Sequence, residues 1–535
     1  MKRWNGWGDE KITYPFPPSA RDYLASCLGP GSLLEDASLA DTLATVPPTR
    51  LKENPLYSIL PTDRLLHARG QSLPDWIALR SGQIGMFPDG VAFPQEEGQV
   101  QALLDFARKR NITLIPYGGG TSVVGHINPL PDQRPVLTVD MSGMNHLLAL
   151  DETSWLATFE AGVSGPQLES ELGRHGFTLG HFPQSFDYST LGGWVATRSS
   201  GQQSYHYGRI ENLFAGGRML TFSGEMELPP LPASAAGPDI KQLLLGSEGH
   251  LGILTRAVIR VQRLPRVDRF QAAFFHDWQD GVEAVRAMAQ AGVGVSMLRL
   301  SNPRETETTL ALAGREDLVR WLDRGLNLGH FGPKRCLLIY GLTGSRRATR
   351  QALAEANHLI RNHHGLATGT LIGSMWRKSR FTSPYLRNTL WEAGYALDTL
   401  ETALPWSNLS ACADELLPTL QSGLVKVNEP VLAFAHLSHV YVDGVSLYVT
   451  YLFRRVTDPV DMLQRWERLK SAASEVIIKN GGTISHQHGV GHDHVTWLGS
   501  EKSMPGMYLL ETACAALDPQ GLLNPGKLLA RKGKR

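Results

Sequence analysis

The stretch PYGGGTSVVGHINP, residues 116–129, places three successive glycines beside two hydroxyl side chains, directly after the apolar residues Ile112, Leu114 and Ile115. Glycine accepts positive φ and lets backbone N–H groups approach a ligand, so such a run after a strand can form a concave nest for an anion such as a pyrophosphate. An ordinary tight turn is the alternative. The stretch is not GxGxxG, so it does not indicate an NAD-type Rossmann site. Other segments must decide between the two interpretations.

The composition narrows the class of protein. A chain of 535 residues with 42% hydrophobic content can bury several cores. Lysine and arginine total 52 against 51 acidic residues, so the net charge of +1 gives no general field for nucleic acid, and no nucleic-acid partner is expected. The four cysteines form no CxxC pair, which favours a reducing compartment. No secretory leader and no run of about eighteen apolar residues is present, so we expect a cytoplasmic protein that does not span a membrane.

The hydrophobic patterns divide the chain into four parts. Residues 1–90 combine prolines with helix-like pieces and indicate an N-terminal helical arm. Residues 91–270 contain short β-branched runs, turns and a few helices, and residues 271–480 alternate strands with long amphipathic helices, so both predict α+β domains. Residues 481–535 predict a helix followed by a Pro/Gly stop and a short apolar end.

Three further segments share the character of the first. They are FDYSTLGGWVATRSSGQQSYHYGRIENL (residues 186–213), GSEGHLGILT (246–255) and NPGKLL (524–529). Small residues and hydroxyls at this density suit a backbone that lies flush against a flat or phosphorylated ligand. Each segment alone is explained equally well by an ordinary turn, but the combination is far more specific.

In this combination and order the segments resemble the vanillyl-alcohol-oxidase-type flavoproteins. The resemblance implies an α+β fold in which residues 91–270 form a two-subdomain FAD-binding domain, residues 271–480 form an α+β cap domain, and residues 481–535 return to the FAD domain. The first stretch matches that family's PxGGGTS pyrophosphate cradle. WNGWG (4–8), RLLHARGQSLPDW (64–76) and SHQHGVG (485–491) further resemble the alkyldihydroxyacetonephosphate synthases and their bacterial relatives.

The same resemblance implies FAD as the cofactor and non-covalent binding. His126 could be proposed as a point of covalent attachment, but the loop centre is Thr121 and Ser122, where covalently flavinylated relatives carry a histidine or cysteine nearby. The expected cofactor-binding residues are Pro116, Gly118, Gly119, Gly120, Thr121, Ser122, Asp187, Ser189, Thr190, Gly192, Gly193, Thr197, Ser199, Gly201, Glu248, Gly249, Gly252 and Ile253.

Histidines gather in AFAHLSHVYVDG (residues 433–444) and SHQHGVGHDH (485–494). On a strand, His486 and His488 would project to one face, a geometry that suits metal ligands or acid–base groups. Related flavin dehydrogenases of 2-hydroxy acids carry HxGDGNLH and SGEHGxG, which the resemblance implies hold a divalent metal. Here Tyr448 replaces the final histidine of the first motif and Gln487 replaces the glutamate of the second. Because a phenol and a neutral amide are poor ligands for such a cation, no metal site is expected.

The synthase pattern fits better. Tyr448, His486 and His488 match its tyrosine and the outer two of its three adjacent histidines, and the resemblance implies that these residues and Arg387 are catalytic. Gln487 departs from the middle histidine. Arg299 and Arg387 match two synthase arginines, and bidentate guanidinium groups suit a phosphate or carboxylate head group. A surface ion pair is the alternative for Arg299. Arg299, Arg387 and Gln487 are therefore the expected substrate-binding residues.

The resemblance implies a reaction without net redox change. A base removes a proton from C1 of an acyl-dihydroxyacetone phosphate, the acyl chain leaves as a fatty acid, and a fatty alcohol takes its place, as in ether-lipid synthesis. The proton requires a base with a pKa near the working pH, which points to His488 aided by Tyr448, with Arg387 on the phosphate. An FAD-dependent oxidase or dehydrogenase of a 2-hydroxy acid or another alcohol is the alternative, favoured by NPGKLL, and a non-enzymatic FAD- or lipid-binding protein is a third. A small lipid substrate, peripheral membrane contact and a homodimer are further expectations.

Overall fold

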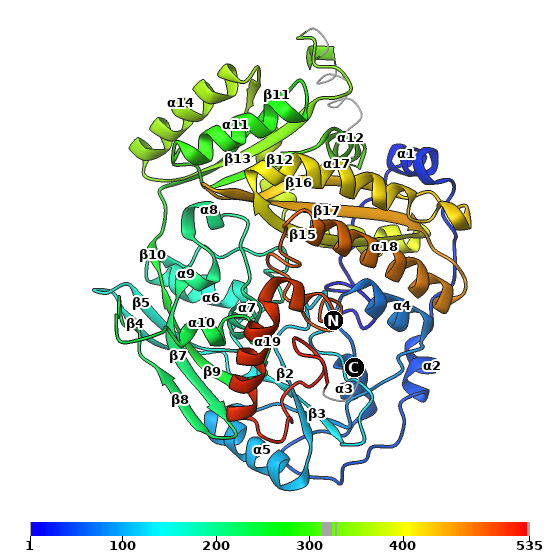
Figure 1. The fold of residues 1–535 in the computed structure, drawn as a ribbon, viewed down its shortest axis with the longest axis vertical. Coiled ribbons are helices and arrows are strands. Elements are labelled where there is room, and N and C mark those ends of the chain that lie inside the picture. The colour runs from blue at the N-terminus through cyan, green and yellow to red at the C-terminus, as the bar shows by residue number, and fades with distance from the viewer. Residues whose placement is uncertain (1, 313–323, 327–328, 532–535) are drawn as a thin grey trace.

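The computed structural model describes residues 2–312, 324–326 and 329–531. The arm contributes four helices that run along one side of the molecule (Figure 1): α1 (Pro18–Leu28), α2 (Leu39–Ala44), α3 (Pro61–Leu66) and α4 (Leu73–Ser81). Helix α4 begins with a capping box, in which the Ser72 hydroxyl accepts from the Asp75 backbone N–H and the Asp75 carboxylate accepts from that of Ser72. This cap fixes the start of α4 beside the cap domain.

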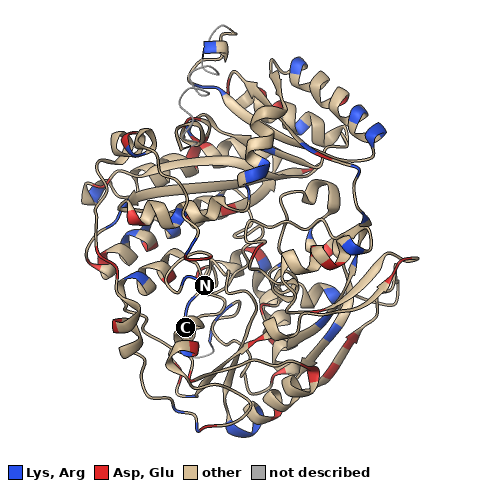
Figure 2. Ribbon diagram, turned by 180° about the vertical axis from the view of Figure 1, so that it is seen from behind, with Lys and Arg blue, Asp and Glu red and all other residues tan. Residues whose placement is uncertain are grey.

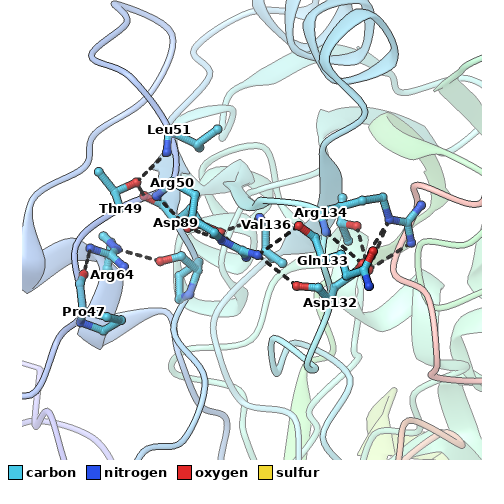
Figure 3. A network of polar contacts seen from close by, with 12 residues as sticks. Pro47, Thr49, Arg50, Leu51, Arg64, Asp89, Asp132, Gln133, Arg134 and Val136 are labelled. Atoms are coloured by element: carbon cyan, nitrogen blue, oxygen red, sulfur yellow. Dashed lines mark hydrogen bonds and ion pairs between the residues drawn. The ribbon is translucent and has the colours of Figure 1, made fainter.

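The arm is bonded to the first sheet by a polar network (Figure 3). The Nη2 of Arg50 lies 2.6 Å from the buried carboxylate of Asp89, and its Nη1 donates to the carbonyl of Asp132 at 2.9 Å. The same Asp89 carboxylate accepts the backbone N–H of Val136 at 2.8 Å. Burial opposes ionisation of Asp89, but the Arg50 bond and the backbone N–H bonds outweigh it and lower the pKa of this carboxyl. Asp89 therefore connects the arm, strand β1 and strand β3.

Two sheets make up the FAD-binding part. Strands β1 (Gly90–Ala92), β3 (Val136–Asp140) and β2 (Thr113–Tyr117) pair in parallel in that order, and helix α5 (Glu97–Arg110) provides the crossover from β1 to β2. The second sheet is antiparallel, in the order β4 (Leu147–Asp151), β5 (Leu156–Glu160), β9 (Ile253–Arg260), β7 (Phe214–Thr221) and β8 (Gly224–Leu228). Strand β9 alternates buried and half-buried residues, as expected for a strand with one face in the core.

Shorter elements complete this part: η1 (Met141–Gly143), α6 (Gly165–Arg174), β6 (Phe177–Thr178), α7 (Leu191–Thr197), α8 (Ser204–Tyr207), α9 (Ile210–Leu213), α10 (Lys241–Leu244) and β10 (Gln262–Arg263). Helix α7 begins at Thr190, whose side chain accepts from Gly193 N–H. The segment that the sequence singled out at residues 186–213 is thus a turn leading into short helices.

The cap is built on a seven-stranded antiparallel sheet above the FAD-binding part (Figure 1). Its order is β14 (Leu366–Gly369), β11 (Val267–Phe275), β13 (Cys336–Gly344), β12 (Met297–Ser301), β16 (Leu432–Val440), β17 (Gly444–Arg454) and β15 (Tyr395–Pro405). Its helices are α11 (Trp278–Gln290), α12 (Pro303–Leu312), α14 (Arg346–Asn362), α15 (Thr370–Ser379), η2 (Ser383–Tyr385), α16 (Leu386–Glu392), α17 (Trp406–Ser422), η3 (Val425–Val427) and α18 (Pro459–Lys479).

Alternation along these strands separates the two faces of the cap sheet. Leu338, Tyr340 and Val449 belong to one core cluster with residues of α11, α14 and α17. Their neighbours Leu337 and Ile339 point to the opposite face, where they pack with Ile372 and Trp376 of α15. Since the first face is covered by long amphipathic helices, the second is the one turned toward the cofactor-binding part.

The C-terminal segment contains α19 (Leu498–Leu517) and then returns to the first sheet. Leu523 forms a parallel bridge with Leu114 of β2, and the side-chain amide of Asn524 donates to the carbonyl of Glu248 at 2.8 Å. The described residues have the predicted α+β fold, with a two-sheet part and a cap sheet above it. Residues of both charge signs are scattered over the helices and loops (Figure 2). Among the described residues, every helix is too short or too polar to cross a bilayer.

Candidate active site

A cavity of about 1320 Å³ lies between the FAD-binding part and the cap sheet. It is lined by most of the residues that the sequence marked: Pro116, Gly118, Gly119, Gly120, Thr121, Ser122, Ser189, Thr190, Gly192, Gly193, Thr197, Ser199, Glu248, Gly249, Gly252, Ile253, Arg299, Arg387, Tyr448, Gln487 and His488. Three of the marked residues are outside the lining. Asp187 is exposed, Gly201 is buried and bonds through its carbonyl to His439, and His486 is buried within residues 485–494, called here the histidine loop.

The glycine stretch after β2 provides the donors that a pyrophosphate needs. The backbone N–H groups of residues 119–122 donate no hydrogen bond within the described part of the chain, and these residues line the cavity. Successive free N–H groups in a turn form an anion nest, so the residues present fit the diphosphate of FAD.

The glycines themselves have a further reason to be there. Only Gly120 has positive φ (72°), whereas a Cβ on Gly119 would lie 1.7 Å from the carbonyl oxygen of Tyr188 and one on Gly118 would lie 2.3 Å from Thr190 Oγ1. Their side of the loop is packed directly against the 186–190 turn. The sequence predicts that the glycines let a ligand approach, but two of the three instead let a neighbouring loop approach.

Glu248, in the 246–255 segment, contacts two other segments that the sequence singled out, residues 116–129 and 485–491. It has φ of 51° in the 246–255 turn, and its carboxylate accepts the backbone N–H groups of Val490 (2.6 Å) and Gly491 (2.8 Å). Burial opposes ionisation, but His126 and these N–H bonds outweigh it and lower the pKa of Glu248. His126 is held on both sides, with Nε2 3.2 Å from Glu248 and Nδ1 2.8 Å from Ser122 Oγ. Nδ1 is therefore engaged by Ser122, and Nε2 faces the Glu248 carboxylate without forming a hydrogen bond.

Across the cavity, the cap sheet presents rows of side chains whose polarity falls in one direction. Pairing of β12, β16, β17 and β15 places one residue of each strand in register on a common face, and this row consists of Ser301, His436, Tyr448 and Glu401. The next row along the strands consists of Phe434, Thr450 and Thr399, and the third of Leu432, Leu452 and Leu397. The cavity wall therefore runs from ionisable groups to hydrocarbon.

Arg299 projects from β12 into the same region and is paired rather than free. Its Nη2 lies 2.6 Å from Glu305 and 3.2 Å from Nδ1 of His436, and that nitrogen is 3.0 Å from Glu305. Burial alone would raise the pKa of Glu305. The charges of His436 and Arg299 have the larger effect, and they lower the pKa to about 2. His436 and Glu305 also line the cavity, and the sequence had not marked them as site residues.

Arg387 at the start of α16 is better placed to receive an anion. Its Nη1 donates to the carbonyl of Gln71 at 2.5 Å, and its guanidinium lies 4.4 Å from the ring centre of Trp76. Within the described residues, its buried Nε and Nη2 have no hydrogen-bond partner. Two parallel N–H groups of one guanidinium are the donor set that a phosphate accepts in a bidentate manner.

The histidine loop is organised by Glu401, which the sequence did not reveal. Glu401 Oε1 accepts the backbone N–H groups of Gln487 (2.6 Å) and His488 (2.8 Å), and it lies 3.5 Å from His488 Nδ1. Its Oε2 lies 3.8 Å from His486 Nδ1. We expected strand geometry to align the two histidines, but residues 480–497 form no strand or helix, so the shared carboxylate brings the rings to one centre. Because β15 also carries Asp398, Thr399 and Thr402, its sequence gives no local signal that singles out Glu401.

Electrostatics distinguish the roles of the two groups nearest the cavity. Burial lowers the pKa of His488 and Glu401 only partly offsets this, so the imidazole is neutral at pH 7 and can accept a proton. Burial raises the pKa of Tyr448, so this phenol keeps its proton and acts as a donor. The rings of Tyr448 and His488 are 5.8 Å apart in an edge-to-face arrangement. The described residues include no group of three or more His, Cys, Asp or Glu side chains that could hold a metal ion.

The fold and this cavity define a FAD-linked enzyme. Residues 88–228 match the family model "FAD binding domain", and residues 264–528 match "FAD linked oxidases, C-terminal domain". The chain is similar to the alkyldihydroxyacetonephosphate synthase of Dictyostelium discoideum, with 32% identity over 489 residues that cover 90% of this chain and 79% of the relative. It is 30% identical to that of Caenorhabditis elegans over 574 residues, with 98% and 95% covered.

A solved structure of an alkyldihydroxyacetonephosphate synthase superposes with a TM-score of 0.85 at 28% identity, covering 98% of both chains. The chain belongs to the alkyldihydroxyacetonephosphate synthase family.

Proposed function

We propose that the protein exchanges the acyl chain of an acyl-dihydroxyacetone phosphate for a fatty alcohol, with FAD bound non-covalently. The observation that carries the proposal is the set of surfaces in one cavity: beside the anion nest for FAD lie the uncommitted guanidinium nitrogens of Arg387 and the cap-sheet rows, which run from ionisable groups to Leu452 and Leu397. A substrate with a phosphate head, a reactive carbon and a long chain matches Arg387, the ionisable row and the apolar row. Membership of the family supports this assignment.

Arg387 is proposed to hold the substrate phosphate, because two of its buried nitrogens are uncommitted. Arg299 is already paired with Glu305, so we assign it a weaker contact with the polar part of the substrate. Gln487 lines the cavity with a side-chain carbonyl oxygen that has no partner among the described residues, and it is proposed to accept a hydrogen bond from substrate.

The proton at C1 is assigned to His488, whose neutral imidazole lines the cavity. Bound FAD supplies an electron-accepting ring that stabilises the negative charge left at C1. Tyr448 donates a hydrogen bond to the departing acyl oxygen, and His486 supports the loop from behind. The bond from C1 to the acyl oxygen breaks, the alcohol oxygen bonds to C1, and C1 regains one proton, so the products are one ether and one fatty acid.

Oxidation of a 2-hydroxy acid is the second candidate, and the NPGKLL terminus favours it. Anaerobic incubation of the yellow protein discriminates between the two. With palmitoyl-dihydroxyacetone phosphate and hexadecanol we expect hexadecyl ether and palmitate while the flavin stays oxidised. Bleaching by D-lactate or glycolate, with no ether from the lipid mixture, would favour the second candidate.

A long-chain substrate also implies access from a bilayer. Leu366 and Leu371 line the cavity and are 43% and 52% exposed, so they form an apolar rim. We propose that the protein is cytoplasmic and touches a lipid surface peripherally through this rim. A homodimer is proposed as its assembly state.

A further inference from the structure

The carboxylate of Glu401 is a buried polar group beside the cavity, and nothing in the proposed exchange gives it a role. It lies at the end of the ionisable row on β15 and is 2% exposed. An isolated buried carboxylate is costly, so its partners must hold the charge. Burial raises the pKa of Glu401, but His488, His486 and the N–H of Gln487 outweigh it, and the pKa falls well below its ordinary value. Glu401 is therefore an anion at any pH near neutrality.

A carboxylate only accepts hydrogen bonds, which constrains every group that faces it. The ring nitrogen of His488 that faces Glu401 is Nδ1, at 3.5 Å, and the facing nitrogen of His486 is also Nδ1, at 3.8 Å. In a neutral imidazole one nitrogen carries the proton and the other accepts. Neither contact has the geometry of a hydrogen bond, and Nδ1 of His486 and Oε2 of Glu401 have no hydrogen-bond partner among the described residues. The anion therefore favours the proton on Nδ1 of both rings through its charge.

The contacts of the second ring nitrogen, Nε2, test this assignment of the protons independently. Nε2 of His486 lies 2.6 Å from the hydroxyl of Tyr441. With the His486 proton on Nδ1, Nε2 accepts from Tyr441, and the bond is satisfied without ionising either group. The corresponding Nε2 of His488 is the nitrogen left to the cavity, where a base is needed.

We propose that Glu401 is a positioning residue that fixes His486 and His488 together in their Nδ1–H forms and thereby leaves Nε2 of His488 as the basic nitrogen of the cavity. The proposal rests on the proposed function for the role of that base, but the protonation pattern itself does not. Gln487 and His488 also donate their backbone N–H groups to Glu401 Oε1. The same carboxylate therefore holds the loop in place and sets the tautomers of its histidines.

Other charged and titratable groups surround this centre and enter any pH dependence. They are Asp398 on β15, Tyr448 on β17, His439 on β16, Lys470 on α18, Arg209 and Glu211 at α9, Tyr441 after β16, and His494 in the loop itself. Arg209 donates to the carbonyl of His486 at 2.8 Å and pairs with Glu211 at 3.2 Å, so it is already neutralised. Glu401 is thus the anion in direct contact with both rings.

Histidine nitrogen NMR on the holoprotein tests the tautomers without substrate. With ¹⁵N-histidine labelling, and assignment by the signals lost in His486→Gln and His488→Gln, we expect both residues in the Nδ1–H form in the wild type. In Glu401→Gln the amide oxygen is expected to keep the two backbone N–H bonds, which places the NH₂ group where Oε2 faces Nδ1 of His486. His486 is therefore expected to shift to Nε2–H, and loss of the anion removes the bias toward Nδ1–H in His488. Either ring in the Nε2–H form in the wild type would overturn the proposal.

Kinetics provide the second readout. We expect Glu401→Gln to lower kcat by about 10²- to 10⁴-fold with little change in KM, as when an orienting carboxylate is replaced by an amide. Glu401→Asp should recover part of the loss, and the exposed Glu467→Gln control on α18 should behave as wild type. Full turnover by Glu401→Gln would overturn the proposal. If wild type shows the Nδ1–H forms but no ether synthesis, the proposed function fails while the positioning role stands.

Discussion

Glu401 lies directly opposite Tyr448 in the antiparallel pairing of β15 and β17, and His436 lies opposite Tyr448 on the other side. Directly paired residues of antiparallel strands share a face, so strand register alone places a carboxylate, a phenol and an imidazole in one line. A shift of one residue in either strand would turn these groups into the helix-covered core. The stability of the cap sheet is thus a condition for the site.

Tyr448→Phe removes only the hydroxyl from this row. Since burial keeps the phenol protonated, we expect loss of a hydrogen-bond donor and a fall in kcat of about 10²-fold, with FAD still bound. Ether formation by purified enzyme checks it, with the exposed Tyr508→Phe on α19 as the matched control. Undiminished turnover would show that the Tyr448 hydroxyl takes no part in the chemistry.

Arg387→Lys keeps a positive charge but removes the bidentate donor pair. We expect kcat/KM to fall by about 10²-fold, or about 3 kcal/mol, mainly through a higher KM for the phosphate substrate. The exposed Arg174→Met serves as control. An unchanged KM would show that the substrate phosphate does not bind to Arg387 on α16.

Leu397→Trp fills the apolar end of the cavity, where Leu397 and Leu452 are paired across the sheet. Competition between fatty alcohols of different lengths should then shift toward shorter chains, because the added ring takes up volume that the chain would occupy. Leu33→Trp at an exposed position is the control. A preference that stays the same would place the alcohol chain elsewhere.

Asp89→Asn tests the link between arm and sheet. We expect a loss of about 2 to 3 kcal/mol in the free energy of unfolding at pH 7, because the partners of a buried carboxylate lose its charge. The pKa of Asp89 is lowered by folding, so its stabilisation is present above the unfolded pKa of about 3.9 and is lost as the pH falls below it. Urea unfolding should therefore show that the difference in unfolding free energy between variant and wild type becomes smaller at acid pH. The exposed Asp22→Asn should leave unfolding unchanged at every pH, and a gap that widened in acid would be the wrong sign.

The segments suited to contact a ligand through their backbone could be recognised from the sequence. Glycines and hydroxyls at residues 116–122, 189–199 and 246–255 are local patterns, so resemblance to a flavoprotein family could be recognised from them and they do line the cavity. It could not reveal why Gly119 is a glycine, since the obstacle is the carbonyl of Tyr188 in another loop.

Glu401 shows the same limit within the site. Its partners Gln487 and His488 are more than eighty positions further along the chain, and the contact depends on how β15 pairs in the sheet. A single glutamate within a strand has no local pattern that distinguishes it from a solvent-facing residue. The histidine loop was visible in the sequence, but the group that orients it was not.

Removal of a proton from C1 next to His488 is the step on which the proposed exchange depends. Acyl-dihydroxyacetone phosphate carrying deuterium at both C1 positions tests it when it is converted with hexadecanol in ordinary water. We expect mass spectrometry of the ether product to show one deuterium at C1 and one hydrogen taken from solvent, with formation abolished in His488→Gln. An ether that retains both deuterium atoms would contradict proton removal at C1 and, with it, the assigned role of the histidine loop.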